Sequence, residues 1–254
     1  MKNCLRFVPL IALASTLFAT NASAAIITPL GPNSASINFI ALTEETAANG
    51  GLGESAWSTL SIPSFFGMQI TGHATNDNDT AQFAYLDKGT AGLGSCKDSS
   101  SANVATPGSG ANRCDPGSDD NVTDHEYLEF TFDEDVVVDN LWFNNNHNGG
   151  FGTNPDGSED MVTIGVGLQG AALTDPGGVF PGTAFEVALG YTDGVNGIGS
   201  FKVAKGDRLW VAFNNEQFYL SGMAVSAVPV PAAVWLFGTA LLGFIGYGRR
   251  TSVS

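Results

Sequence analysis

The feature that most constrains the fold is a two-residue alternation of apolar and polar side chains in the body of the chain. Leu128, Phe130 and Phe132 alternate with other residue types, and residues 208–213 repeat the pattern. Successive side chains of a β-strand point to opposite faces, so this alternation is typical of strands with one face in a core. No window of the body sustains the period of an amphipathic helix.

Similar segments recur along the body, and Gly, Asn, Asp or Pro residues separate them. The candidate strands are residues 36–42, 57–62, 67–72, 80–86, 126–132, 136–143, 161–168, 183–189, 199–204, 208–213 and 218–226. The chain also contains 32 glycines, which fits many turns better than long helices. The pattern predicts an all-β fold, namely an antiparallel β-sandwich or a jelly-roll-like domain.

The N-terminus is typical of a secretory signal peptide. Lys2 and Arg6 precede an apolar run that continues to Thr20, and small residues then lead to Ala24 and Ala25. A basic start, a short apolar middle and a small-residue exit are the three parts of such a signal. The alternative, a membrane anchor, is disfavoured because the run is short for a span. We expect a signal peptidase to cut between Ala24 and Ala25.

The C-terminus carries a second apolar segment, which is uncharged over residues 232–248 and ends in two arginines. A helix of that length covers about 25 Å, near the lower limit for a hydrocarbon core. The arginines are expected to stay on the cytoplasmic side. Prolines keep residues 228–231 extended and accessible. Residues expected in or beside the membrane include Ala232, Trp235, Phe237, Gly243, Arg249 and Arg250.

This segment resembles a PEP-CTERM sorting signal. The resemblance lies in the run Val228-Pro229-Val230-Pro231-Ala232-Ala233-Val234-Trp235-Leu236-Phe237-Gly238, the apolar residues after it and the arginine pair. It implies recognition by an exosortase, cleavage near the prolines, and delivery to the cell surface or extracellular matrix of a Gram-negative, polysaccharide-producing bacterium. Val230 stands where the name-giving motif has Glu, so the chain resembles a variant subtype. The alternative is a C-terminal anchor that is never cut.

These ends divide the chain into a signal peptide (1–24), a β-sandwich (25–226) and a sorting segment (227–254). The whole chain has a formal charge of −15. Without Lys2, Arg6 and the two C-terminal arginines, six basic residues remain against 25 acidic ones, a charge of about −19. Such a field repels phosphate backbones and disfavours nucleic-acid binding. Divalent cations and neutral glycans remain compatible partners, and the acidity also serves solubility.

Two cysteines remain once Cys4 leaves with the signal peptide. Cys96 and Cys114 flank a polar loop, and an even pair in an exported chain predicts a disulfide. Closing a loop of this length stabilises the fold by roughly 3 kcal/mol. A zinc site is disfavoured, because two thiolates without neighbouring ligands do not complete one.

Oxygen-rich loops raise the possibility of calcium binding. Calcium takes six to eight oxygen ligands in flexible geometry, which Asp and Asn turns supply. The alternative is that these residues only favour turns. The candidate ligands are Asp115, Asp119, Asp120, Asp156 and Asp160.

The sequence predicts an exported surface or matrix protein that acts by binding or as structure and is not an enzyme. The first alternative is a calcium-dependent carbohydrate-binding module, in which aromatic side chains stack on sugars. The second is a secreted hydrolase, which would need a pocket that gathers His147 with carboxylates. No motif of a nucleophile elbow, a metalloprotease helix or a P-loop is present in the chain. The expected partners are signal peptidase, an exosortase, the inner membrane transiently, and extracellular polysaccharide.

Overall fold

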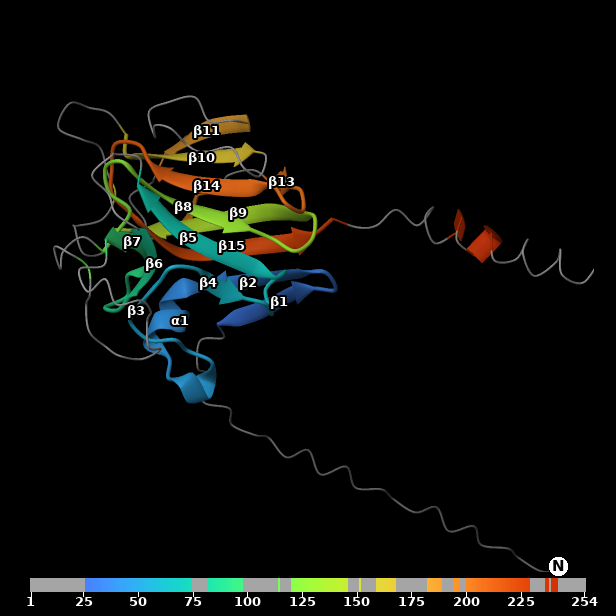
Figure 1. The fold of residues 1–254 in the computed structure, drawn as a ribbon, viewed down its shortest axis with the longest axis horizontal. Coiled ribbons are helices and arrows are strands. Elements are labelled where there is room, and N and C mark those ends of the chain that lie inside the picture. The colour runs from blue at the N-terminus through green and yellow to red at the C-terminus, as the bar shows by residue number, and fades with distance from the viewer. Residues whose placement is uncertain are drawn as a thin grey trace, which may run out of the picture.

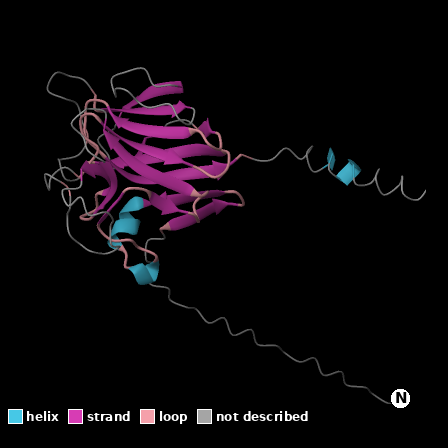
Figure 2. Cartoon of the chain, viewed as in Figure 1, coloured by secondary structure: helices cyan, strands magenta, loops and turns pink. Residues whose placement is uncertain are grey.

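The structure is a computed structural model, and it describes residues 26–74, 82–97, 114, 120–145, 151, 159–167, 182–188, 194–196, 200–228, 236–237 and 239–241. Two antiparallel sheets stack face to face, and the strands make up most of the described body (Figures 1 and 2). The predicted all-β, antiparallel, sandwich-like fold is therefore confirmed. Two short helices, α1 (Phe39–Glu44) and η1 (Ala47–Asn49), lie at one edge.

The strands divide unequally between the sheets. The nine-stranded sheet holds β1 (Ile27–Gly31), β2 (Ser34–Asn38), β3 (Ser55–Trp57), β6 (Gln82–Asp87), β7 (Gly92–Lys97), β9 (Val136–Asn144), β12 (Gly194–Asn196), β13 (Phe201–Val203) and β15 (Tyr219–Ala227). The six-stranded sheet has the order β11 (Gly182–Ala188), β10 (Met161–Gly167), β14 (Arg208–Phe213), β8 (Glu126–Thr131), β5 (Met68–Ala74) and β4 (Leu60–Ile62). Strands distant in sequence thus become neighbours: β8 pairs with both β5 and β14.

The main core lies between the sheets and takes the alternate residues that the sequence pattern predicts. Leu128 and Phe130 of β8 are buried there with Leu209 and Val211 of β14. Apolar side chains from β6, β9 and β15 of the opposite sheet join the same cluster. Burial of this surface is non-directional and proportional to area, so it stabilises the stacking of the sheets without specifying their outer faces.

The boundaries of several predicted strands are wrong. Residues 39–42, expected in a strand, form α1, because the Asn38 side chain accepts a hydrogen bond from the Ala41 backbone N–H at 2.9 Å and caps the helix. The predicted strand 57–62 is two strands: β3 lies in the nine-stranded sheet and β4 in the six-stranded one. The prediction also missed β1, β7 and β12, which contain Gly, Pro or Asn and no clear alternation.

Four chain segments meet at the end of the sandwich where β15 finishes, which we call the tail end. They are the β1–β2 hairpin, the β4–β5 turn, the β8–β9 turn and the end of β15. Ala227 donates its backbone N–H to the Asn33 carbonyl at 2.8 Å, and Val228 donates to the Asp135 carbonyl at 3.0 Å. The described chain therefore leaves the sandwich at this end, beyond the arrowhead of β15 in Figure 1.

Candidate functional site

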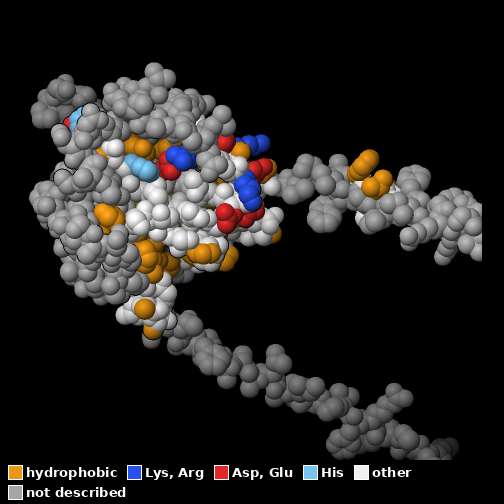
Figure 3. All heavy atoms as spheres, viewed as in Figure 1, with side chains coloured by type: hydrophobic (Ala, Val, Ile, Leu, Met, Phe, Trp, Pro, Cys, Tyr) orange, Lys and Arg blue, Asp and Glu red, His pale blue; other side chains and the backbone are white. Residues whose placement is uncertain are grey.

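The outer face of the six-stranded sheet carries a group of polar and aromatic side chains over β5, β8 and β14. Core residues occupy one set of alternate positions in these strands, so the residues between them face outward. Strand pairing sets Thr71 and Trp210 on either side of Glu129, and it sets His73 beside Tyr127. Figure 3 shows a histidine, an acidic and a basic side chain close together on this side of the molecule.

Glu129 is the centre of this group. Its side chain is 10% exposed, and its Oε2 atom accepts a hydrogen bond from Arg208 Nη1 at 2.8 Å. The same oxygen accepts one from Trp210 Nε1 at 3.0 Å. A carboxylate taken out of water is costly unless charged or polar donors satisfy it. Arg208 and Trp210 together provide this compensation.

His73 lies beside Glu129 on the neighbouring strand. Its ring stacks on the Tyr127 ring with centroids 4.8 Å apart and an angle of 11° between planes. The Nε2 atom lies 2.8 Å from Thr71 Oγ1 and 3.9 Å from Glu129 Oε1. Burial lowers the pKa of His73, although Glu129 acts in the opposite direction. The imidazole is therefore favoured in its neutral form.

The aromatic rings of this face are not available as a sugar-stacking platform. Trp210 is 0% exposed and Tyr127 is 6% exposed. Burial, followed by the charge of Glu129, raises the pKa of Tyr127 to about 12. The accessible part is instead polar, since the His73 side chain is 36% exposed and that of Arg208 is 26% exposed. Such an edge offers hydrogen bonds and charge to a ligand.

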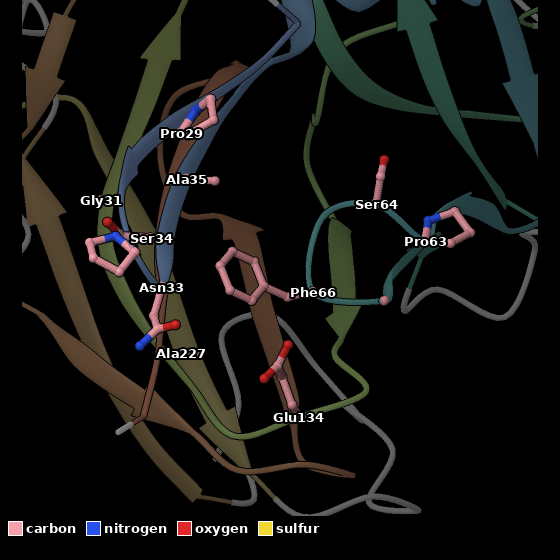
Figure 4. Close-up of a pocket in the computed structure, with 12 residues that line it drawn as sticks. Pro29, Gly31, Asn33, Ser34, Ala35, Pro63, Ser64, Phe66, Glu134 and Ala227 are labelled. Atoms are coloured by element: carbon pink, nitrogen blue, oxygen red, sulfur yellow. The ribbon is translucent and has the colours of Figure 1, made fainter. Parts of the chain in front are cut away.

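A recess of about 470 Å³ lies at the tail end. The β1–β2 hairpin forms one wall, and Figure 4 shows Phe66 and Glu134 on the turns that face it. The recess is open and contains no arrangement of catalytic groups among its lining residues, which include Pro29, Asn33 and Ala227. The recess lies beside Ala227, where the described sandwich ends.

The predicted disulfide is present between Cys96 and Cys114, whose Cα atoms are 5.4 Å apart. Cys96 lies within β7. The bond belongs to a small buried cluster with Phe83 and Tyr85 on the outer face of the nine-stranded sheet. The Tyr85 hydroxyl donates to Glu54 Oε1 at 2.8 Å, and burial raises the pKa of Tyr85 well above its usual value.

Of the five predicted calcium ligands, Asp115, Asp119 and Asp156 lie outside the described residues. Asp120 accepts a hydrogen bond from the Tyr219 hydroxyl at 2.6 Å. Within the described ranges, no three His, Cys, Asp or Glu side chains come together as a metal site would require.

Asp160 has different neighbours from Asp120. It is 4% exposed and close enough to Glu216 to raise the pKa of that carboxyl, with burial as the larger cause. Asn145 Nδ2 donates to Glu216 Oε1 at 2.9 Å, while the buried Asn145 Oδ1 has no hydrogen-bond partner. The two carboxyls and the amide form a small oxygen-rich group.

The predicted processing and anchor residues lie mostly beyond the described part of the chain. Val228 is described at the end of the sandwich, and Phe237 is described in a short helical stretch. The other predicted residues, Ala24, Ala25, Pro229, Val230, Pro231, Ala232, Trp235, Gly243, Arg249 and Arg250, are outside the described ranges, as is His147. Among the residues that the structure describes, no helix has the length and hydropathy needed to cross a membrane.

Sequence reasoning did not select His73, Glu129 or Arg208 as site residues. The sequence did hold one indication of them. Each is a polar residue that alternates with the core-facing residues of its strand and therefore points outward. Only the pairing of β8 with both β5 and β14 brings the three side chains together. Comparison with known family models, curated proteins and solved structures found no match.

Proposed function

We propose that this chain is an exported protein that an exosortase sorts to the cell surface or extracellular matrix, where its jelly-roll-like sandwich binds extracellular polysaccharide. Binding is assigned to the outer face around Glu129, and no catalytic role is assigned. The sorting part rests on the N-terminal and C-terminal sequence patterns. The binding part rests on the ion pair and histidine that this face presents beside exposed polar groups.

The contrast in exposure between the C-terminal segment and the sandwich supports the sorting proposal beside those sequence patterns. Leu236 is 70% exposed, Phe237 is 73% exposed and Leu241 is 53% exposed. In the described sandwich, by contrast, large apolar side chains are buried or half-buried, and Leu30 is the one that is exposed to a comparable degree. Exposed apolar side chains on a helical stretch are expected to be covered by another phase or molecule. A bilayer, and then the sorting enzyme, would cover them here.

The Glu129 face suits neutral glycans better than acidic polymers. The charge of about −19 expected for the processed body repels polyanions. Sugar hydroxyls both donate and accept hydrogen bonds, and this face offers a carboxylate, a guanidinium and an imidazole. His73 and Arg208 are the parts of the network that a ligand can reach.

Mass spectrometry of the protein from its host tests the sorting proposal. We expect the mature protein to begin at Ala25 and to end near residues 229–231. Deletion of the exosortase should make the chain with an uncut C-terminus accumulate. Ser254 at the C-terminus of every molecule in the intact host would refute processing.

A glycan array tests the binding proposal with two matched variants. His73→Asn changes the proposed face, whereas His125→Asn changes a histidine whose side chain is 48% exposed and that precedes β8. Asn suits the positive φ of 69° at position 125. We expect His73→Asn to weaken glycan binding and His125→Asn to leave it unchanged. Equal binding by both variants and the unaltered chain would move the site away from this face.

A calcium-dependent carbohydrate-binding module is the second candidate function. Its support is the oxygen-rich group of Asp160, Glu216 and Asn145, in which the buried Asn145 Oδ1 atom has no hydrogen-bond partner. Calcium favours carboxylate and amide oxygens together. Isothermal titration with calcium checks this candidate: heat that disappears in Asp160→Asn supports it, and no heat with the unaltered protein excludes it.

A further inference from the structure

Leu30 is an exposed apolar residue at the same end of the sandwich as the departing C-terminal chain. It is 58% exposed and lies in the β1–β2 hairpin, next to Pro29 and near Pro32. It is the single large apolar side chain of the described sandwich that is exposed to this degree. Single exposed apolar side chains are common on protein surfaces, so what sets Leu30 apart is its position at the end where the C-terminal chain departs.

The hairpin is held directly against the last residues of β15. The Asn33 carbonyl accepts the Ala227 backbone N–H at 2.8 Å, and residues of the hairpin share the tail-end recess with Ala227. The Val228 backbone is in turn held by the Asp135 carbonyl at 3.0 Å. The position at which the chain leaves the sandwich is therefore tied to the hairpin by hydrogen bonds.

Chain length then limits the distance between this end and a bilayer. The uncharged segment begins at Ala232, four residues after Val228. Four fully extended residues reach at most about 14 Å. The polar layer on each side of a bilayer is about 5–7 Å thick. An anchored precursor cannot hold its tail end far from the headgroups.

We infer that the β1–β2 hairpin is a membrane-contact surface in the anchored precursor, with Leu30 inserted among the lipids beside the C-terminal segment. The inference rests on the proposed anchoring by that segment. Pro29, Pro32 and Phe66 line the recess behind the hairpin and extend its apolar character. Glu134 also lines the recess, and a carboxylate is not attracted to anionic headgroups. The contact therefore depends on the apolar side chains of the hairpin.

A site-specific fluorescent label tests the contact in the full chain. A Cys4→Ser background removes the thiol of the signal segment, and the disulfide occupies Cys96 and Cys114. Leu30→Cys places the environment-sensitive label NBD on the hairpin. Asp124→Cys is the matched control, since Asp124 is 73% exposed and lies at the opposite end of β8 from the β8–β9 turn. Both proteins are reconstituted into phosphatidylcholine vesicles with nitroxide-labelled lipid.

The expected result is a blue-shifted label at position 30 that the nitroxide lipid quenches, and an unquenched label at position 124. A chain ending at Val228 should lose the quenching at position 30. If the full chain floats with the vesicles and neither label is quenched, the hairpin contact is wrong although anchoring stands. If both labels are quenched equally, the orientation is wrong. If the full chain does not float, anchoring fails and the contact fails with it.

Discussion

Both sheets bury a small cluster on their outer faces, and the two clusters are stabilised by different chemistry. On the nine-stranded sheet, the Cys96–Cys114 disulfide joins Phe83 and Tyr85. On the six-stranded sheet, the Glu129 carboxylate joins Arg208, Trp210 and their neighbours. A covalent bond persists whatever the protonation of its surroundings, whereas an ion-paired network depends on geometry and charge. The first arrangement suits a structural role, and the second suits a site that responds to a ligand.

Removing the disulfide should produce the largest loss of stability. The double variant Cys96→Ser, Cys114→Ser releases a loop closed across 18 positions, and we expect a loss of about 3 kcal/mol in the free energy of unfolding. Urea denaturation under oxidising conditions measures it. A matched comparison is the unaltered protein under reducing conditions, which should show a similar loss. An unchanged midpoint in both cases would remove the structural role assigned to this cluster.

Breaking the charged network should cost somewhat less. Glu129→Leu leaves Arg208 and the Trp210 N–H without their shared acceptor, and we expect a loss of about 2 kcal/mol. The double variant Glu129→Leu, Arg208→Met removes both charges and should regain a large part of that stability. Chemical denaturation of the set measures the coupling. If adding Arg208→Met to Glu129→Leu instead lowered the free energy of unfolding further, as an unrelated second substitution would, the two residues would act independently.

The Tyr85 hydrogen bond contributes a smaller amount within the disulfide cluster. Tyr85→Phe keeps the buried ring and removes the hydroxyl that donates to Glu54 at 2.8 Å. We expect a loss of about 1 kcal/mol in thermal or urea unfolding. Tyr85→Leu, which removes the ring as well, serves as the comparison and should cost more. Equal losses in the two variants would contradict a separate contribution from the hydroxyl.

The pH dependence of the Glu129 face should be the smallest effect. Burial places the folded-state pKa of His73 below its ordinary value of 6.5, so the unfolded chain takes up a proton first as the pH falls. The stability contribution of His73 is present above 6.5 and is lost as the pH falls toward the folded-state pKa.

Unfolding of the unaltered protein and of His73→Asn between about pH 8 and about pH 5 isolates this contribution. We expect the variant to lose less stability over that range than the unaltered protein. His125→Asn is the control, because its side chain is 48% exposed. Parallel curves for the unaltered protein and His73→Asn would show that titration of His73 does not affect folding.

The sequence by itself determined the fold class and the two faces of its clearest strands. Alternation places Leu128 and Phe130 on the core side of β8 in any sandwich, because side chains of a strand point to opposite faces. The cysteine pair likewise followed from the even count in a chain expected to be exported. These inferences use only local order along the chain and residue counts.

Tertiary structure alone decided the boundaries and the candidate site. Alternation cannot show that Asn38 caps a helix or that β3 and β4 enter different sheets, since both depend on local hydrogen bonds and distant partners. The grouping of His73, Glu129 and Arg208 required three strands from separate parts of the chain to pair in one register. A strand's own pattern determines which of its faces is buried but not which strands lie beside it. For that reason the sequence predicted the sandwich, and only the structure brought together the candidate site on its outer face.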